Sequence, residues 1–253
     1  MHIVLLTLSL VASVQAVPHA TPAQSDTGFH HIRWYEAAAA VGGTAAVMVL
    51  DQPVQRFLQR HRTETTDDIA DVFRQGGAAP IALLATGGLT LSGVVAKNDK
   101  LRDDGLRAGV SIFVGTVAAE ALKVGIGRGR PASFTSATDF RPFTSEHDTL
   151  GVESRGSFPS GHTVVAFALA TSLADDIHHT PASVALYTIA AGTGLSRLND
   201  DRHWLSDVVG GMVIGVTSAR LVSGRWRVFG LRPPSVLLAP DFVALRWHQA
   251  LGP

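Results

Sequence analysis

The sequence predicts an all-α protein, a bundle of about six core helices. Hydrophobic residues make up 46% of its 253 residues and charged residues only 17%, whereas soluble domains usually carry roughly 25% charge. Long apolar stretches recur along the chain, with Gly, Ala and Ser interspersed and few β-branched clusters, which favours helices over strands. Polar connectors and prolines separate these stretches. The pattern indicates helices packed against one another, or helices within a membrane.

The N-terminus has the features of an export signal. An apolar run from Ile3 to Val14 is followed by Gln15 and Ala16, so small residues stand at the −3 and −1 positions of a cleavage site. A run of about 12 apolar residues is too short to cross a hydrocarbon core of ~30 Å. We therefore expect a signal peptide at 1–16 and a polar linker at 17–33, with an uncleaved anchor as the alternative.

Residues 34–223 are expected to form the helical-bundle domain. The predicted core helices are the apolar stretches Ala37–Leu50, Ala79–Ala96, Ala108–Ala119, Thr163–Ala174, Val184–Leu195 and Val208–Val222. Pro80, Pro159 and Pro181 stand at or near three of the helix starts, where proline is tolerated. The charged segment Asp51–Gly76 is expected to hold a helix of its own, and Arg128–Arg155 a long polar loop. The tail at 224–253 is rich in proline and is expected to lie along the surface.

Composition alone leaves two environments open for the bundle. Gln75–Ala96 is a charge-free run clearly long enough to cross a membrane, whereas charged or polar residues interrupt the other stretches. The chain carries 21 Lys and Arg against 21 Asp and Glu, and this balance argues against a nucleic-acid partner. It has no Cys, which excludes disulfides and thiolate metal sites. A membrane-embedded bundle and a soluble or peripheral bundle both remain compatible.

Three short motifs contain the polar side chains that are candidates for catalysis and for substrate binding. The first runs from Lys123 to Arg130 and Pro131, the second is Gly156–Thr163 and contains Pro-Ser-Gly-His, and the third is Ser196–Asp207. Each motif lies at the end of an apolar stretch. A helical bundle would therefore bring all three to one end.

These motifs resemble the signature of the type 2 phosphatidic acid phosphatase / vanadium haloperoxidase superfamily. Its pattern is K-x6-RP, PSGH and SR-x5-H-x3-D, and the sequence matches every fixed position in order. The resemblance covers roughly Ala37 to Val222. It implies a helical fold with the active site at one end, and a metal-independent phosphatase that acts through a phosphohistidine. It also implies no resident cofactor, with vanadate as an inhibitor that mimics phosphate.

Physical reasoning on the motif residues agrees with an oxyanion site. Lys123, Arg130 and Arg197 would bring three cations to one place, and buried like charges need an anionic ligand. One guanidinium group can donate hydrogen bonds to two phosphate oxygens at once, and an ammonium group adds a point charge. Ser160 and Gly161 stand where Pro159 starts a helix, so backbone N–H groups would face the anion.

The two motif histidines receive different roles. Asp207 lies four residues after His203, and on one helical face its carboxylate would accept the proton of one imidazole nitrogen. The other nitrogen would then be free to attack phosphorus, so we expect His203 to be the nucleophile. His162 stands beside the phosphate-binding turn and would be the general acid, then the base that activates water. The resemblance implies the same roles for these positions.

Other polar residues are less informative. Arg128 and Arg202 lie beside the motifs and would either contact substrate or be solvated. No metal site is expected, because His147, His178 and His179 lack partners at ligand spacing. Nothing in the sequence selects an entrance residue among Asp139, Arg141, Glu146, Asp148 and Glu153.

The expected substrate is a phosphorylated lipid or a phosphorylated small molecule, and the sequence leaves this choice and the oligomeric state open. One alternative is a vanadate-dependent haloperoxidase. Another is a broad-specificity soluble periplasmic acid phosphatase, because GSFPSGHT is similar to the GSYPSGHT block of the secreted acid phosphatases.

The expected location is the bacterial cell envelope, in the inner membrane or the periplasm, with the active site facing the periplasm. A cleaved signal followed by six spans would instead place the site on the cytoplasmic side. Ala37–Leu50 is short and starts beside Glu36. An uncleaved N-terminal run would resolve this conflict, but we expect either that an odd number of the first three segments does not span, or that the protein is soluble in the periplasm.

Overall fold

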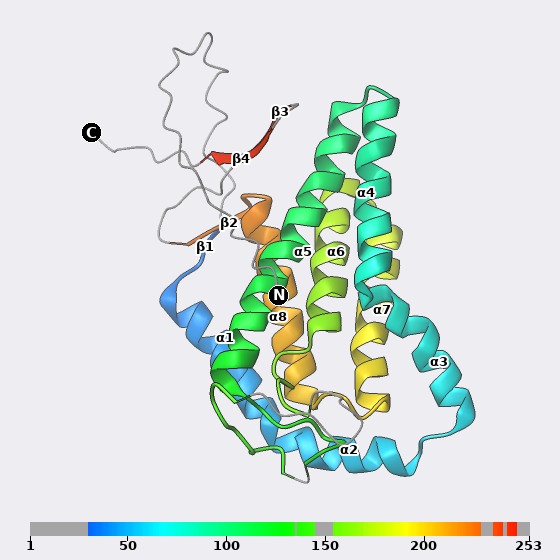
Figure 1. Ribbon diagram of the computed structural model, residues 1–253, viewed down its shortest axis with the longest axis vertical. Helices are drawn as coiled ribbons and strands as arrows, with labels where there is room; N and C mark the ends of the chain where they lie inside the picture. The colour runs from blue at the N-terminus through cyan, green and yellow to red at the C-terminus, as the bar shows by residue number, and fades with distance from the viewer. Residues whose placement is uncertain (1–29, 135, 145–153, 229–234, 240–241, 247–253) are drawn as a thin grey trace, which may run out of the picture.

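Helices dominate the computed structural model, which describes residues 30–134, 136–144, 154–228, 235–239 and 242–246 (Figure 1). The helices are α1 (Trp34–Val47), α2 (Asp51–Arg60), α3 (Glu64–Arg74), α4 (Ala79–Val95), α5 (Asp99–Ile126), α6 (Gly161–Ile177), α7 (Thr180–Asn199) and α8 (Leu205–Val222), with 3-10 turns η1 (Met48–Leu50) and η2 (Gln75–Gly77). The predicted all-α class is confirmed. The signal peptide predicted at 1–16, the linker up to residue 29 and part of the loop, including His147, lie outside the described residues.

Short strands lie near the two ends of the domain. β1 (His30–His31), at the end of the predicted linker, pairs in parallel with β2 (Trp226–Arg227) in the predicted tail. Further along the tail, β3 (Ser235–Ala239) and β4 (Phe242–Arg246) form an antiparallel hairpin. The tail therefore has local β structure that its prolines did not indicate.

α6 is the central helix of the bundle and packs against α5, α7 and α8. Its sequence is apolar or small on every face, and a helix of this kind is stable only when neighbours surround it. Close approach depends on small residues in the partners. A Cβ on Gly215 of α8 would lie 2.6 Å from the backbone oxygen of Val164, so only glycine lets the two backbones come this near.

α5 extends well beyond the apolar stretch expected at Ala108–Ala119. It begins after Asn98, whose side chain accepts the N–H of Leu101, and it continues for 28 residues. The charged first turns fit the helix because Asp104 pairs with Lys100 at 2.6 Å and with Arg107 at 2.5 Å. The helix ends at Gly127, whose φ of +57° gives a left-handed C-cap.

In the part of the chain that the structure describes, three helical segments are long and apolar enough to cross a membrane: Trp34–Arg60, Asp99–Ile126 and Leu205–Val222. The expectation that the first apolar segment is short was wrong, because the helix continues from α1 through η1 and α2 for 27 residues. The helix expected at Ala79–Ala96 is confirmed as α4, Ala79–Val95, whereas the longer charge-free run Gln75–Ala96 is not one straight helix. The segment bends by 47° between α3–η2 and α4, where Gly76, Gly77 and Pro80 weaken the helix.

The charged segment Asp51–Gly76 forms two helices rather than one. α2 ends at Arg60, and Thr63 caps α3 by accepting the N–H of Thr66 at 3.2 Å. In Figure 1, α2 lies across the lower end of the bundle and α3 rises at its side. This lower end is also where the three sequence motifs meet.

Candidate active site

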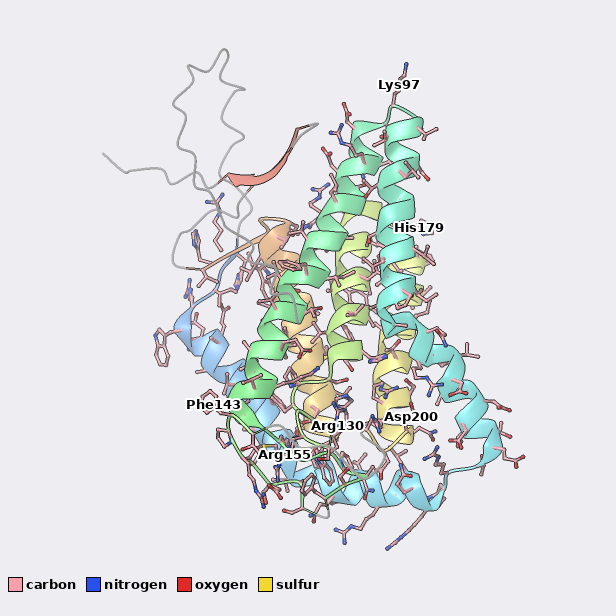
Figure 2. The ribbon with its side chains drawn as sticks, viewed as in Figure 1. Lys97, Arg130, Phe143, Arg155, His179 and Asp200 are labelled. Atoms are coloured by element: carbon pink, nitrogen blue, oxygen red, sulfur yellow. The ribbon has the colours of Figure 1, made fainter. Side chains whose placement is uncertain are left out.

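The three motifs converge at the lower end of the bundle. The first follows the C-terminus of α5, the second enters the N-terminus of α6, and the third joins α7 to α8. In Figure 2, Arg130 and Asp200 lie at this end, whereas Lys97 marks the opposite end. The site is therefore built from helix termini: the N-termini leave backbone N–H donors, and the C-termini leave backbone carbonyl acceptors, without helical partners.

His203 is held by its Nδ1 atom. Nδ1 lies 2.7 Å from the backbone oxygen of Ser157, an acceptor, so the Nδ1 atom carries the proton of the neutral ring. The Nε2 atom is then unprotonated and lies 3.5 Å from Nη1 of Arg130. The side chain is 5% exposed. The imidazole thus presents a lone pair toward the cationic side of the site.

The expected helical pairing of His203 with Asp207 was wrong in its geometry. α8 begins at Leu205, so His203 precedes the helix and does not share a helical face with Asp207. Asp207 Oδ2 still lies 3.7 Å from His203 Nδ1, which is ion-pair distance but too long for a hydrogen bond. The direct acceptor is the carbonyl of Ser157.

Asp207 is fully buried and joins several parts of the site. Its Oδ2 accepts hydrogen bonds from the Ser157 hydroxyl at 2.5 Å and from the Trp204 N–H at 2.8 Å. Its Oδ1 accepts from Nη1 of Arg128 at 2.5 Å. Its backbone oxygen accepts the N–H of Ser160 at 3.0 Å. The carboxylate therefore links the motif-two loop to the start of α8.

Lys123, Arg130 and Arg197 surround the start of α6. A Cβ built on Gly161 would lie 3.3 Å from Nζ of Lys123, so the ammonium sits directly beside this glycine. The ammonium also pairs with Glu120 at 2.7 Å. Arg130 and Arg197 are 8% and 7% exposed, and Asp200 receives a hydrogen bond from Arg197 at 2.8 Å. Burial and the neighbouring guanidinium groups of Arg74, Arg202 and Arg130 lower the pKa of Arg197, while Asp200 opposes this effect.

The N-terminus of α6 completes this arrangement. Ser160 is the N-cap, Gly161 is the first helical residue and His162 follows. Ser160 is fully buried, and its hydroxyl oxygen accepts a hydrogen bond from Thr163 at 2.9 Å. Free N–H groups at a helix start favour a negative charge. Together with the three cations they suit a tetrahedral oxyanion, and they do not suit a metal cation.

Both histidines are neutral in the ligand-free site at neutral pH. Burial lowers the pKa of His203 to about 4, although the nearby Asp207 acts in the opposite direction. Burial also lowers the pKa of His162 to about 4, and Arg197, His203 and Lys123 add to the effect. Because the cations disfavour protonation, a bound anion would raise the pKa of His162.

The structure also brings in polar residues that the sequence did not single out. Asp51, Ser157 and Ser206 are fully buried next to Asp207, and Arg74 hydrogen-bonds Asp200 at 3.3 Å. Arg128 is neither solvated nor placed on the substrate side, because it is fully buried between Asp51 and Asp207. Asp139 is the partner of Arg155, at 2.9 Å. These contacts join residues far apart in the chain, so no local pattern indicates them.

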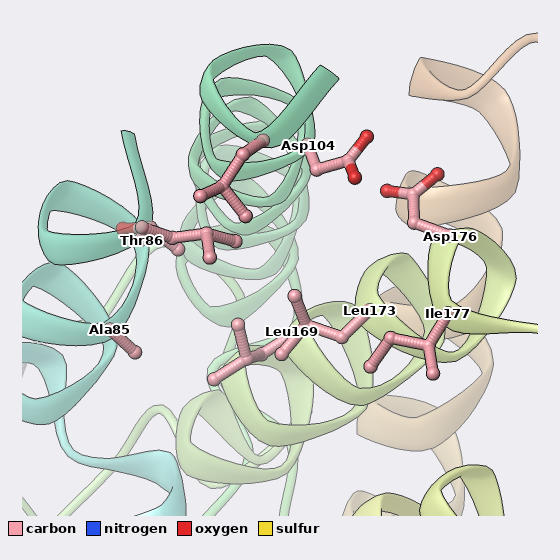
Figure 3. A pocket seen from close by; sticks show the side chains of 9 residues that line it. Ala85, Thr86, Asp104, Leu169, Leu173, Asp176 and Ile177 are labelled. Carbon is pink, nitrogen blue, oxygen red and sulfur yellow. The ribbon is translucent and has the colours of Figure 1, made fainter. Parts of the chain in front are cut away.

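A separate cavity lies between α4, α5 and α6 (Figure 3). It has a volume of about 250 Å³ and is lined mainly by apolar side chains of α4, α5 and α6, with Asp104 and Asp176 at one side. It contains none of the motif residues. The candidate active site is therefore distinct from this cavity.

Comparison with known proteins shows that all three motifs lie within a match to one family model. Residues 104–228 match the model of the PAP2 superfamily. The chain is 46% identical to the lipid A 1-phosphatase of Porphyromonas gingivalis over 72 residues. The matched segment makes up 28% of this chain and 16% of that protein. Over 74 residues the chain is 35% identical to an acid phosphatase of Zymomonas mobilis, which is 29% of this chain and 27% of that protein. The chain thus matches less than a third of the length of either relative.

Two solved structures share the fold. LpxE of Aquifex aeolicus superimposes with a TM-score of 0.53 at 22% identity, over 69% of this chain and 94% of that chain. The transmembrane PAP2 type phosphatidylglycerolphosphate phosphatase of Bacillus subtilis gives a TM-score of 0.55 at 23% identity, over 74% and 92% of the two chains. At this level of identity the likeness establishes the helical architecture.

The lowered pKa of His162 generates a prediction about anion binding. Sulfate is a tetrahedral dianion that does not itself titrate near neutral pH, and its charge should raise the pKa of His162 from about 4. Binding at pH 6 should then be accompanied by uptake of up to about one proton per site. Calorimetric titration in buffers of different ionisation enthalpy measures this uptake. His162→Asn should abolish it, and equal uptake in that variant would contradict the assignment.

Proposed function

From the membership of residues 104–228 in the PAP2 superfamily, we propose that this chain is a phosphatase that hydrolyses phosphate monoesters or diphosphates through a phosphohistidine. His203, His162 and Asp207 carry the chemistry. Lys123, Arg130, Ser160, Gly161 and Arg197 bind the phosphoryl group. No metal or cofactor takes part.

The observation that carries the proposal is the orientation of the His203 ring. The Ser157 carbonyl fixes the proton on Nδ1, and Nε2 faces Arg130. A phosphoryl group bound by Arg130, Arg197 and Lys123 would therefore meet a neutral, unprotonated nitrogen. A burial-lowered pKa of about 4 keeps His203 in this form at neutral pH.

Two displacements at phosphorus complete the reaction. In the first, the bound anionic substrate has raised the pKa of His162, so that its ring is protonated. Nε2 of His203 forms a bond to phosphorus, the bond to the leaving oxygen breaks, and His162 gives this proton to that oxygen. In the second, water attacks phosphorus while His162 takes one of its protons. The N–P bond then breaks, and inorganic phosphate and the neutral His203 ring are released. Phosphoryl transfer is mainly a matter of positioning and charge stabilisation, which the cations and helix N–H groups supply.

The natural substrate in this proposal is a phosphorylated lipid, and the protein is associated with a membrane. Among the described residues, three helical segments are long and apolar enough to span a membrane. Large apolar side chains on α1, α4 and α5 are strongly exposed, including Trp34 at 82%, Leu84 at 72% and Phe113 at 68%. Such surfaces are rare on soluble monomers and suit lipid contact. One relative is named a lipid A 1-phosphatase, which favours the same substrate class.

The alternatives receive less support. The second relative is named an acid phosphatase, which leaves soluble phosphate esters as a candidate substrate class. A vanadate-dependent haloperoxidase would use the same cations to hold vanadate. Both curated relatives are named phosphatases, which favours phosphate hydrolysis.

Substitution of the two histidines should affect different steps. His203→Ala should lower kcat by roughly 10³-fold or more on every substrate, because the covalent route is lost. His162→Ala should lower kcat by about 10²–10⁴-fold on alkyl phosphates. It should lower kcat much less on p-nitrophenyl phosphate, whose leaving group needs no proton. Steady-state kinetics on both substrates tests this, and a fully active His203→Ala protein would refute the nucleophile.

A substrate panel in the presence of EDTA tests both the class of substrate and the absence of a metal. Phosphate release should be unaffected by EDTA and inhibited by vanadate. Values of kcat/KM for phosphorylated lipids should exceed those for soluble esters by about tenfold or more, because apolar contacts add binding energy to the lipid. Strict dependence on a divalent cation would contradict the mechanism. A preference for soluble esters would point to the acid phosphatase alternative.

We further propose that the protein is exported to the cell envelope and that its site faces the periplasm. The chain has no Cys, so a single introduced Cys is a unique label. Phe143 lies at the end of the bundle that holds the site, and Lys97 lies at the opposite end (Figure 2). In intact cells, a membrane-impermeant maleimide should label Phe143→Cys but not Lys97→Cys. The reverse pattern would place the site in the cytoplasm.

A further inference from the structure

A buried ionic network lies behind His203, on the side away from Arg130. Arg128 and Asp51 are both fully buried. The Arg128 guanidinium donates from Nη2 to Asp51 at 2.6 Å and from Nη1 to Asp207 at 2.5 Å. Its Nε and Nη2 atoms also donate to the backbone oxygen of Ala137, at 2.9 and 2.6 Å. Nη1 also donates to the hydroxyl oxygen of Ser206 at 2.7 Å. The guanidinium is thus held in one orientation by four acceptor groups: Asp51, Asp207, Ser206 and the backbone oxygen of Ala137.

Asp51 anchors the far side of this network. Its Oδ1 accepts the backbone N–H of Ser206 at 2.8 Å, and its Oδ2 accepts the hydroxyl of Ser206 at 2.7 Å. Asp51 is the first residue of α2 and lies outside the stretch that matches the family model. It therefore connects the N-terminal helices to the start of α8.

Ser157 transmits this arrangement to the nucleophile. Its N–H donates to the backbone oxygen of Arg128 at 2.9 Å, and its hydroxyl donates to Asp207 at 2.5 Å. Its carbonyl is the acceptor for Nδ1 of His203 at 2.7 Å. Arg128 thus holds Ser157 twice, once through its own backbone and once through Asp207.

Stability does not account for this network. Buried ion pairs rarely stabilise a fold more than apolar side chains of equal size, because each charge loses its hydration. A role in the reaction does account for it. His203 becomes positively charged when it attacks phosphorus, and the network carries two carboxylates against one guanidinium. Its surplus negative charge favours the charged imidazole, and its rigidity fixes the direction of Nε2.

We propose that Asp51 and Arg128 are positioning residues for the nucleophile: they hold Asp207, and through it the Ser157 carbonyl that orients His203. This inference rests on the proposed phosphohistidine chemistry. It extends the functional set beyond the motifs to a residue of α2.

Asp51→Asn tests the proposal by kinetics. The variant should lose about 10–100-fold in kcat, with little change in KM, because Asp51 does not touch the substrate. Asp175→Asn is the matched control. Asp175 is a buried carboxylate paired with Arg220 at 3.0 Å, near the other end of α6, about 20 Å from His162 by helix rise. The control should retain the wild-type kcat.

A double-mutant cycle separates positioning from a general structural role. If Asp51 acts through Asp207, then Asp51→Asn should have little further effect in an Asp207→Asn background. Full additivity of the two losses, or a kcat for Asp51→Asn equal to that of the control, would overturn the proposal. Should Asp51→Asn fail to fold, Ser206→Ala removes one hydrogen bond to Asp51 and should give a smaller loss in kcat with KM unchanged.

Nuclear magnetic resonance of ¹⁵N-labelled histidine gives a readout that does not depend on turnover. In the wild-type protein the His203 proton should reside on Nδ1, and in Asp51→Asn the population with the proton on Nε2 should increase. An unchanged tautomer would count against the inference even if activity fell. A wild-type protein that hydrolyses no phosphate ester would refute the proposed function, while the tautomer measurement would still decide the role of Asp51.

Discussion

The buried carboxylate of Asp207 is the contact on which the site depends. Its side chain accepts hydrogen bonds from Ser157, Trp204 and Arg128. Its backbone oxygen accepts a hydrogen bond from the N–H of Ser160. The loop before α6 and the start of α8 are therefore fixed relative to each other by one residue. Without these hydrogen bonds, the positions of the cations at the start of α6 and of the His203 imidazole before α8 would not be fixed relative to each other.

The positive charge of the site poses an electrostatic problem, which other carboxylates offset. Several guanidinium groups and one ammonium meet in a largely apolar bundle, and their mutual repulsion opposes folding. Carboxylates offset part of this positive charge. Glu120 forms an ion pair with Lys123, and Asp200 forms ion pairs with both Arg197 and Arg74. The substrate's own charge would supply the rest of the compensation. A site of this kind is most stable when occupied, because ligand binding to the folded state adds to stability.

The sequence predicted which motif residues belong to the candidate site, but not the buried contacts that hold them in position. Short motifs at helix ends indicated which cations and histidines belong together, because spacing along a chain reports local geometry. The acceptor for His203 was missed, because a backbone carbonyl leaves no trace in a motif and because the residue precedes α8 instead of lying on it. Asp51 and Arg128 are 77 positions apart. No periodicity connects them, so their contact emerges only from the packed bundle.

The bend between α3 and α4 is a feature of the backbone that the sequence pattern likewise did not predict. The charge-free run Gln75–Ala96 is long enough to form one straight span, but the chain bends there by 47° between η2 and α4. A Cβ on Gly77 would overlap the backbone of His162, so this turn packs directly on the start of α6. The break also places Arg74 beside Asp200, within reach of the cation cluster. A straight helix would satisfy the apolar pattern equally well. Gly77 packs on His162, and Gly76 packs on Ile189 and Thr193 of α7. These contacts, which the apolar pattern does not contain, account for the glycine pair at the bend.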